Sequence, residues 1–172
     1  KLNYGSTGPG TTSHMATSYF EKLADIKLTH IPYRGAGQSI PALLANDIDL
    51  LFDYPSSSKA LIESGKLVAL ATTGESRVAS LPGVGTLQDA GFPNVTFSPW
   101  DILLVPAATP KDVIGKLGAA LSEVLGKEET KRFFEERGAK PLLLKDEKLL
   151  EFIAAEAAKM KDIAERAGVT AE

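Results

Sequence analysis

Cysteine is absent from this sequence of 172 residues, and histidine is rare. The lack of cysteine excludes disulfide bonds, a thiol nucleophile and thiolate metal sites. The two imidazoles, His14 and His30, lie too far apart in sequence to suggest a metal-binding pair. Asp47 and Asp49 precede an apolar run and are not spaced as a catalytic pair. We therefore expect no metal site, no cofactor and no catalytic residue.

An excess of basic residues and long apolar runs are absent as well. The sequence has 19 Lys and Arg against 22 Asp and Glu, a formal net charge of −3, which argues against nucleic-acid binding. No apolar run approaches the roughly 20 residues of a membrane-spanning helix, so we expect no direct membrane insertion. The hydrophobic content of 44% is ordinary for a globular protein with a core.

A glycine-rich stretch near the start of the chain carries the clearest functional signal. An alternating apolar run around Tyr4 leads into residues 5–13, and an amphipathic helix begins near His14. Glycines allow a ligand to approach the backbone, and free amides at a helix N-terminus favour an anion. The predicted anion-binding residues are Ser6, Thr7, Gly8, Gly10, Thr11 and Thr12. The alternative is a plain connection with a hydroxyl as helix cap.

The same loop resembles a phosphate-binding loop only in part. Gly5 and Gly10 have the spacing of the two glycines, but Thr11 stands where that pattern requires lysine. A phosphate- or nucleotide-binding enzyme that uses this loop therefore remains an alternative hypothesis rather than the leading one.

Apolar periodicity predicts alternating helices and strands in the first part of the chain. After the helix from His14 to Ala24, the pattern gives three strand segments and two intervening helices. The expected strands lie within 26–33, 47–54 and 67–72, and the expected helices at 39–45 and from Pro55 to the stop at Gly65. Alternation of this kind predicts an α/β fold with a mostly parallel sheet, in which ligands bind at the carboxyl ends of the strands.

Composition changes near Trp100, where short Gly/Ser-rich units give way to longer, charged amphipathic segments. Before it we expect only a brief helix ending at Ala90. After it we expect a helix capped by Thr109 with Pro110 as its first residue. The remaining expected elements are a helix at 127–137, a short strand at 142–144 and a helix at 147–167 that ends at Gly168. We place a lobe boundary near Trp100.

Six short sequence motifs occur in a specific order and spacing. They are YGSTGPGTTSHM, HIPYRGAG, DIDLLFD, GKLVALATTGESR, LPGVGTLQDAGFP and PWDILLVPAATPKDVI. Through these motifs the chain resembles the extracytoplasmic solute receptors of tripartite tricarboxylate transporters, also called Bug receptors. The resemblance runs from about Leu2 to Gly168. Because Lys1 stands directly before an expected core strand, we expect a member truncated at the N-terminus, without the family's first-lobe binding loop.

The resemblance implies the type II periplasmic-binding-protein architecture. Residues 1–100 would form a nearly complete second, central lobe, and residues 101–172 the return segment and C-terminal helices of the first lobe. It also implies a receptor without enzymatic activity or cofactor. Such a receptor captures a small carboxylate (a di- or tricarboxylate, an amino acid or an aromatic acid) in the periplasm and delivers it to membrane permease subunits.

The resemblance also assigns site residues. The loop from Ser6 to Thr12 matches the loop that holds one ligand carboxylate, and Tyr33 and Arg34 match the turn between the next strand and helix. Arg34 either pairs with a distal carboxylate or is a solvated turn residue, and Tyr33 either lines the cleft or simply packs. Asp53 matches a position that can face the cleft, and it selects the ligand, caps the helix that follows, or does both.

A third reading is a non-binding fragment that assembles by pairing. If part of the first lobe is missing, apolar faces of the helices after Pro110 would be exposed, and such faces favour dimerisation.

Overall fold

Strands and helices alternate in the first part of the computed structural model, which describes residues 1–93, 96–167 and 169. Its elements are β1 (Asn3–Ser6), α1 (Thr12–Ala24), β2 (Thr29–Pro32), α2 (Ala36–Leu44), β3 (Leu50–Leu51), α3 (Pro55–Glu63), α4 (Lys111–Gly126), α5 (Glu128–Glu135) and α6 (Asp146–Ala167). The predicted alternation is therefore confirmed for the first third of the chain.

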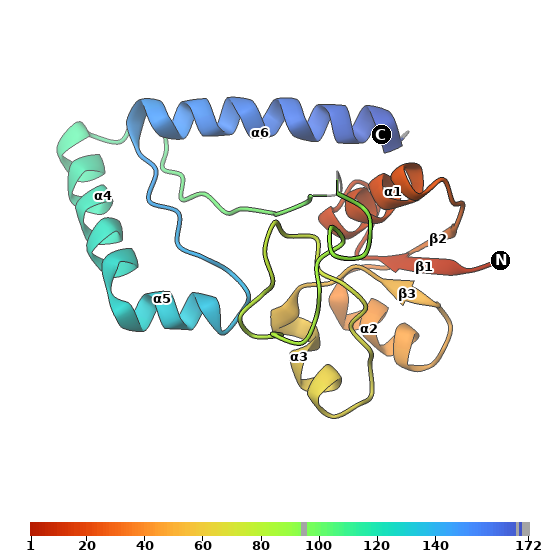
Figure 1. Ribbon diagram of the computed structural model, residues 1–172. Coiled ribbons are helices and arrows are strands. Elements are labelled where there is room, and N and C mark those ends of the chain that lie inside the picture. The colour runs from red at the N-terminus through yellow and green to blue at the C-terminus, as the bar shows by residue number, and fades with distance from the viewer. Residues whose placement is uncertain (94–95, 168, 170–172) are drawn as a thin grey trace.

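The three strands form a parallel sheet in the order β2-β1-β3. The pairing sets Ser6 opposite Pro32 and Gly5 opposite Leu51, so the three carboxyl ends meet at one edge. Figure 1 shows α1 on one face of the sheet and α2 and α3 on the other. This is the arrangement that parallel strands with helical crossovers produce.

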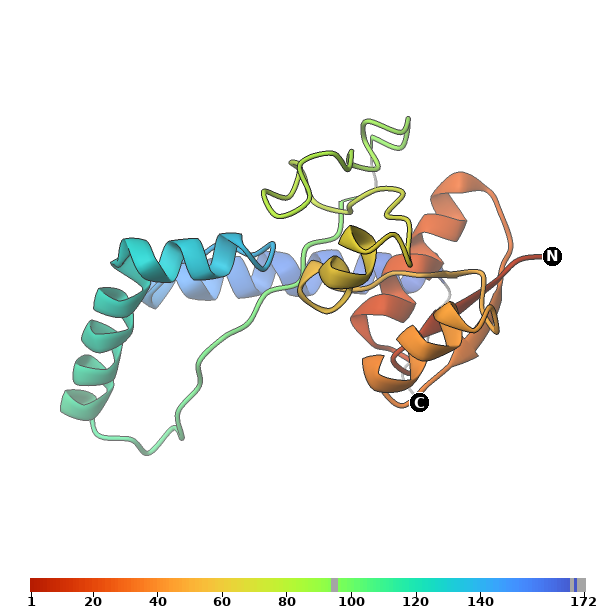
Figure 2. The same ribbon diagram turned by 90° about the horizontal axis from the view of Figure 1, so that it is seen from below.

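The main hydrophobic core lies between α1 and the end of α6. Met15, Ala16 and Tyr19 on α1 pack with Leu87, Phe97 and Ile163, and the Ile163 side chain is 2% exposed. Figures 1 and 2 show α6 spanning the molecule from α4 back to α1. Helix α6, near the end of the chain, thus completes the hydrophobic core around α1, near its start.

Trp100 anchors the segment after the predicted boundary to this long helix. Its indole Nε1 donates a hydrogen bond to Glu156 Oε2 at 3.1 Å, and its ring meets Phe152 edge-on at 5.4 Å. Trp100 is therefore a packing residue between this segment and α6. The division into lobes at 1–100 and 101–172 stays a prediction.

The segment 67–72 differs from its prediction as a buried strand. It pairs with no strand of the sheet, and an isolated bridge joins Thr72 to Thr86. Its exposure alternates: Val68 and Leu70 are 81% and 84% exposed, while Leu67 and Ala69 are partly covered. The local pattern of a strand is therefore present, but within the described residues nothing covers its outer face.

The other local corrections concern two predicted elements that do not form and one element end. The structure shows turns rather than a brief helix before Ala90, and 142–144 is not a strand. Helix α4 begins at Lys111 with Pro110 as its N-cap, so Thr109 is not the cap. Gly65, the predicted stop, follows α3 with φ of +69°, and Gly138 follows α5 with φ of +75°. The predicted stop at Gly168 lies outside the described residues.

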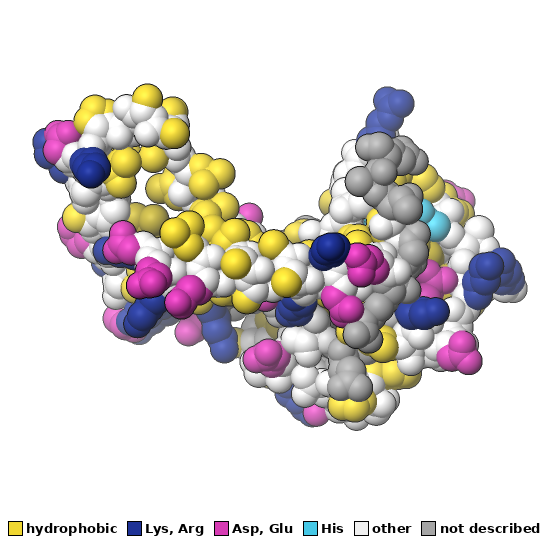
Figure 3. Space-filling view, turned by 90° about the horizontal axis from the view of Figure 1, so that it is seen from above, with side chains coloured by type: hydrophobic (Ala, Val, Ile, Leu, Met, Phe, Trp, Pro, Cys, Tyr) yellow, Lys and Arg dark blue, Asp and Glu magenta, His cyan; other side chains and the backbone are white. Residues whose placement is uncertain are grey.

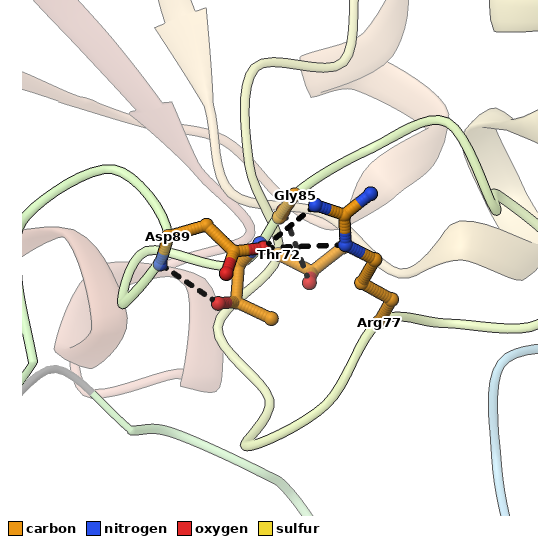
Figure 4. Close-up of polar contacts among 5 residues, drawn as sticks. Thr72, Arg77, Gly85 and Asp89 are labelled. Carbon is orange, nitrogen blue, oxygen red and sulfur yellow. Dashed lines mark hydrogen bonds and ion pairs between the residues drawn. The ribbon is translucent and has the colours of Figure 1, made fainter.

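A polar clasp stabilises the loop between 72 and 91 (Figure 4). The Asp89 carboxylate accepts a hydrogen bond from the Thr86 amide at 3.0 Å, and Asp89 N donates to Thr86 Oγ1 at 3.1 Å. Arg77 lies 3.2 Å from the same carboxylate. The Thr86 amide, and then Arg77, hold the pKa of Asp89 below its usual value. Reciprocal bonds of this kind replace regular secondary structure in this loop.

Hydrophobic side chains remain exposed on the far side of the molecule, where α4, α5 and α6 form an open frame (Figures 1 and 3). On α4 these are Val113, Ile114, Leu117, Leu121 and Val124, each 38–47% exposed. Leu103 and Leu104, which precede α4, are 64% and 74% exposed. Among the described helices, none is both long and apolar enough to cross a membrane.

Candidate functional site

The carboxyl edge of the sheet brings together all three sets of predicted site residues. The loop from Ser6 to Thr11 follows β1, Tyr33 and Arg34 follow β2, and Asp53 follows β3. Tyr33 N donates to Ser6 O at 2.9 Å, which joins the first two segments directly. Sequence reasoning therefore located this edge correctly, because parallel strands end on the same side.

Three helix N-termini point their positive ends toward this edge. None of α1, α2 and α3 has a side-chain cap hydrogen bond, and none has an acidic residue in its first turn. Each uncapped N-terminus carries a partial positive charge that favours an anion. The N-termini of α4 and α5 also lack a side-chain cap hydrogen bond, but each has an acidic residue in its first turn. The three ends at this edge have no such acid and are suited to a ligand that supplies the missing acceptors.

Ser6 holds the loop in shape from within. It is completely buried, and its Oγ accepts from Gly8 N at 3.1 Å and lies 2.6 Å from His30 Nε2. The hydroxyl also reaches Gly8 O at 3.2 Å. Direct contact with a ligand would require this hydroxyl to leave its internal partners.

Ser13, which sequence reasoning did not select, ties both ends of the loop together. Its Oγ accepts from Thr7 N at 2.9 Å and lies 3.1 Å from Thr7 Oγ1 and 3.2 Å from Thr11 Oγ1. Thr11 Oγ1 also donates to Gly8 O at 2.7 Å. The hydroxyls of Thr7, Thr11 and Ser13 thus form one network beneath the loop.

In the segment that follows β1, the amides that remain open belong to the first turn of α1. Among the described residues, the amides of Thr12, Ser13 and His14 form no hydrogen bond. Gly8 and Gly10, with φ of +134° and +70°, turn the chain, but their amides bond to Ser6 and His14. Thr12 is therefore the predicted residue best placed to donate a backbone hydrogen bond to an anion.

Tyr33 and Arg34 differ in their surroundings. The Tyr33 ring is half-buried and lies against Gly5 in β1. Arg34 is exposed, and its backbone amide donates to Gln38 Oε1 at 3.0 Å at the start of α2. The guanidinium is thus an exposed cation beside the edge, suited to bidentate pairing with a carboxylate.

Asp53 does not cap α3. The N-cap is Tyr54, and the Asp53 carboxylate accepts a hydrogen bond from the buried Ser58 hydroxyl. The capping alternative for Asp53 is therefore wrong, and its role toward a ligand stays a prediction.

Two histidines form a stack beside the loop that no sequence spacing predicts. The His14 and His30 rings are parallel within 7°, with centroids 4.1 Å apart, and His30 also stacks on Tyr4 at 4.8 Å. Burial lowers the pKa of both imidazoles. The stack forms because β2 pairs with β1 and brings His30 beside Tyr4, a contact that depends on strand register. No cluster of metal-ligating side chains occurs in the described parts of the chain.

Comparison with known proteins gives one consistent result. A sequence profile of the tripartite tricarboxylate transporter family receptors matches residues 1–169. A Cupriavidus necator protein, "UPF0065 protein in gbd 5'region", is 31% identical over 169 residues, which cover 98% of this chain and 51% of that protein.

Two solved structures share the fold. "R. palustris Rpa4515 with adipate" matches with a TM-score of 0.91 at 27% identity, over 99% of this chain and 57% of that one. The periplasmic binding protein BugD matches with a TM-score of 0.87 at 26% identity, over 99% and 58%. The predicted periplasmic-binding-protein fold is confirmed. The chain spans about half the length of the curated relatives that it matches.

Proposed function

Since this chain belongs to the tripartite tricarboxylate transporter family receptors, we propose that it binds a small carboxylate at the carboxyl edge of its sheet. The observation that carries the proposal is the meeting of three uncapped helix N-termini without a first-turn acid. The family consists of receptors and not enzymes, which disfavours the nucleotide-handling alternative, as does the missing loop lysine.

We infer that the ligand is a dicarboxylate. One carboxylate would accept hydrogen bonds from the open amides of Thr12 and Ser13, and Arg34 would pair with the other. A similar solved structure contains adipate, a dicarboxylate, which supports this choice. Gly8, Gly10 and the hydroxyls of Ser6, Thr7 and Thr11 would shape the loop, while Tyr33 and Asp53 would border the ligand.

Calorimetric titration of the chain with adipate, malate, succinate and hexanoate tests this proposal. We expect Arg34→Gln to weaken dicarboxylate binding by about tenfold or more, as loss of a charge-assisted hydrogen bond does. The monocarboxylate hexanoate should be affected little. Lys116→Gln, on the exposed surface of α4, serves as a control for charge alone.

Two results would contradict the proposal. One is the absence of heat with every carboxylate in the panel. The other is tighter binding of phosphate or ATP than of any carboxylate, which would favour the alternative hypothesis.

We propose that the receptor works in the periplasm and hands its ligand to membrane permease subunits. The family description, a receptor of a tripartite transporter, supports both statements. Recovery of the protein in the fraction released by osmotic shock would support the location. Co-purification with detergent-solubilised permease subunits would support the partnership.

We also propose that this chain self-associates through the open frame of α4, α5 and α6. Leu117 and Leu121 lie on the exposed apolar face of α4, and Leu104 leads into it. The matched solved structures extend beyond the part that aligns with this chain, and a second copy is the partner available to such a face in a solution of this chain alone.

Sedimentation velocity over a range of concentrations tests self-association. We expect a shift from monomer to dimer as concentration rises, and Leu117→Glu with Leu121→Glu should abolish it because burying a carboxylate is costly. Lys116→Glu reverses a charge at a polar position of the same helix and should leave the dimer intact. A clean monomer for the unaltered chain at the highest concentration would contradict the proposal.

A further inference from the structure

The amide of Gly10 depends on an imidazole for its hydrogen bond. Gly10 N donates to His14 Nδ1 at 3.0 Å. A ring nitrogen accepts a hydrogen bond only when it carries no proton. The contact therefore requires a neutral His14 with its proton on Nε2. In a cationic His14, Nδ1 also carries a proton and cannot accept a hydrogen bond from the Gly10 amide.

The second imidazole supports the other glycine of the loop through Ser6. His30 Nε2 lies 2.6 Å from Ser6 Oγ, which in turn accepts from Gly8 N at 3.1 Å. When the Ser6 hydroxyl donates to Gly8 O, His30 Nε2 must be the donor. The two turning glycines of the loop are thus each held by the stacked histidine pair, directly or through one hydroxyl.

We propose that His14 and His30 are positioning residues for the ligand loop, and that protonation of His14 releases Gly10 and loosens the loop. The proposal rests on the proposed function in one respect: it places the pH-sensitive element beside the amides assigned to the carboxylate. Acidification would then weaken carboxylate binding by disordering the loop from Ser6 to Thr12, and the His14 side chain need not contact the ligand.

The surroundings of the pair favour the neutral form near neutral pH. From α1, Glu21 faces His14 and raises its pKa, but the larger effect of burial lowers it. From β1, the Tyr4 ring covers His30, and its hydroxyl lies 3.2 Å from Ser18 Oγ. Burial, and then the neighbouring His14, lower the pKa of His30. Two cations stacked at 4.1 Å would repel, so the pair resists double protonation.

The sign of the stability change follows from these shifts. Because the folded-state pKa of His14 is below that of the unfolded chain, the unfolded state takes up the proton first as pH falls. The stability contributed by the neutral ring is complete above the ordinary histidine range and declines as pH falls through it.

Nuclear magnetic resonance of the ligand-free chain between about pH 7.5 and about pH 5 tests whether protonation of His14 releases the Gly10 amide. We expect the Gly10 amide signal to move with the midpoint of the His14 ring. Its hydrogen exchange, corrected for the intrinsic pH dependence, should quicken by about tenfold. Lys116→Gln should reproduce the unaltered behaviour.

Substitutions at position 14 separate positioning from packing. In His14→Asn the amide oxygen replaces Nδ1 as an acceptor that does not titrate, so Gly10 should stay protected throughout the range. In His14→Leu the Gly10 amide should be unprotected at every pH. If His14→Leu does not fold, comparing the pH dependence of Gly10 protection in the unaltered chain and in His14→Asn still tests the proposal. A Gly10 signal that is indifferent to His14 titration, or His14→Asn behaving like the unaltered chain, would overturn the proposal.

An adipate titration then distinguishes this proposal from the proposed function. Because adipate takes up protons in the same range, the quantity compared is the affinity ratio of the unaltered chain to His14→Asn at each pH. We expect this ratio to fall by about tenfold on acidification. A constant ratio would overturn the link to binding. No adipate binding at any pH, with Gly10 still following His14, would count against the proposed function and leave the positioning role standing.

Discussion

Replacing Gly5 by alanine is expected to lower the free energy of unfolding by about 1–3 kcal/mol, the usual cost of overpacking a core. A Cβ at this position would overlap Ile48 Cδ1 and would lie 3.4 Å from the Tyr33 ring. Ile48 is 2% exposed and has little room to move. Because Gly5 is in the central strand, paired with both neighbours, its backbone is held as well.

A compensating variant makes this prediction specific. Ile48→Val removes the Cδ1 atom that meets the new methyl group, and alone it should cost about 0.5–1.5 kcal/mol. Combined with Gly5→Ala, it should cost clearly less than the sum of the two single changes. Gly115→Ala, in an open position of α4, should stabilise the chain by up to about 1 kcal/mol.

Chemical denaturation of the four variants gives these values. A neutral Gly5→Ala, or strict additivity with Ile48→Val, would show that the contact between Gly5 and Ile48 does not limit packing.

Removing the two loop hydroxyls together, by Ser6→Ala with Thr11→Ala, is expected to reduce both stability and carboxylate affinity. Loss of the buried Ser6 hydroxyl leaves Gly8 N without its acceptor, at a cost of about 1–3 kcal/mol. Thr11 Oγ1 donates to Gly8 O, so both changes loosen the same glycine. We expect dicarboxylate affinity to fall by about tenfold or more, because the α1 amides lose their fixed geometry.

Denaturation and calorimetry on the same preparations separate the two effects. Ser122→Ala removes a hydroxyl that donates to Gly118 O on α4, far along the chain, and controls for loss of a hydroxyl alone. It should change stability slightly and affinity not at all. Unchanged affinity for every dicarboxylate in the loop variant, at concentrations where the unaltered chain binds, would remove the loop from the site.

The position of the candidate site could be predicted from sequence because it depends on local signals. A strand, a glycine-rich turn and a helix start follow one another at residues 3–12, and the same order recurs around Tyr33 and Asp53. In a parallel sheet these turns must share one edge, whatever the details of packing. The sequence motifs shared with the receptor family indicated the same segments independently.

The internal structure of the site could not be predicted in this way. Ser13, His14 and His30 hold the loop through contacts that join residues up to 24 positions apart, as between Ser6 and His30. Such contacts depend on strand register and on the twist of the sheet, which no spacing in the sequence encodes. The hydroxyls expected to meet a ligand, those of Ser6 and Thr11, bond within the protein.

By itself the sequence determined the alternation of strands and helices, the family and the edge where the turns gather, because periodicity, glycine conformation and short motifs act over a few residues. Only the tertiary structure decided that α6 returns to bury Ile163 against α1 and that Val68 and Leu70 remain uncovered. Whether an apolar residue is buried depends on which distant segments lie against it, and burial is therefore a property of the assembled chain.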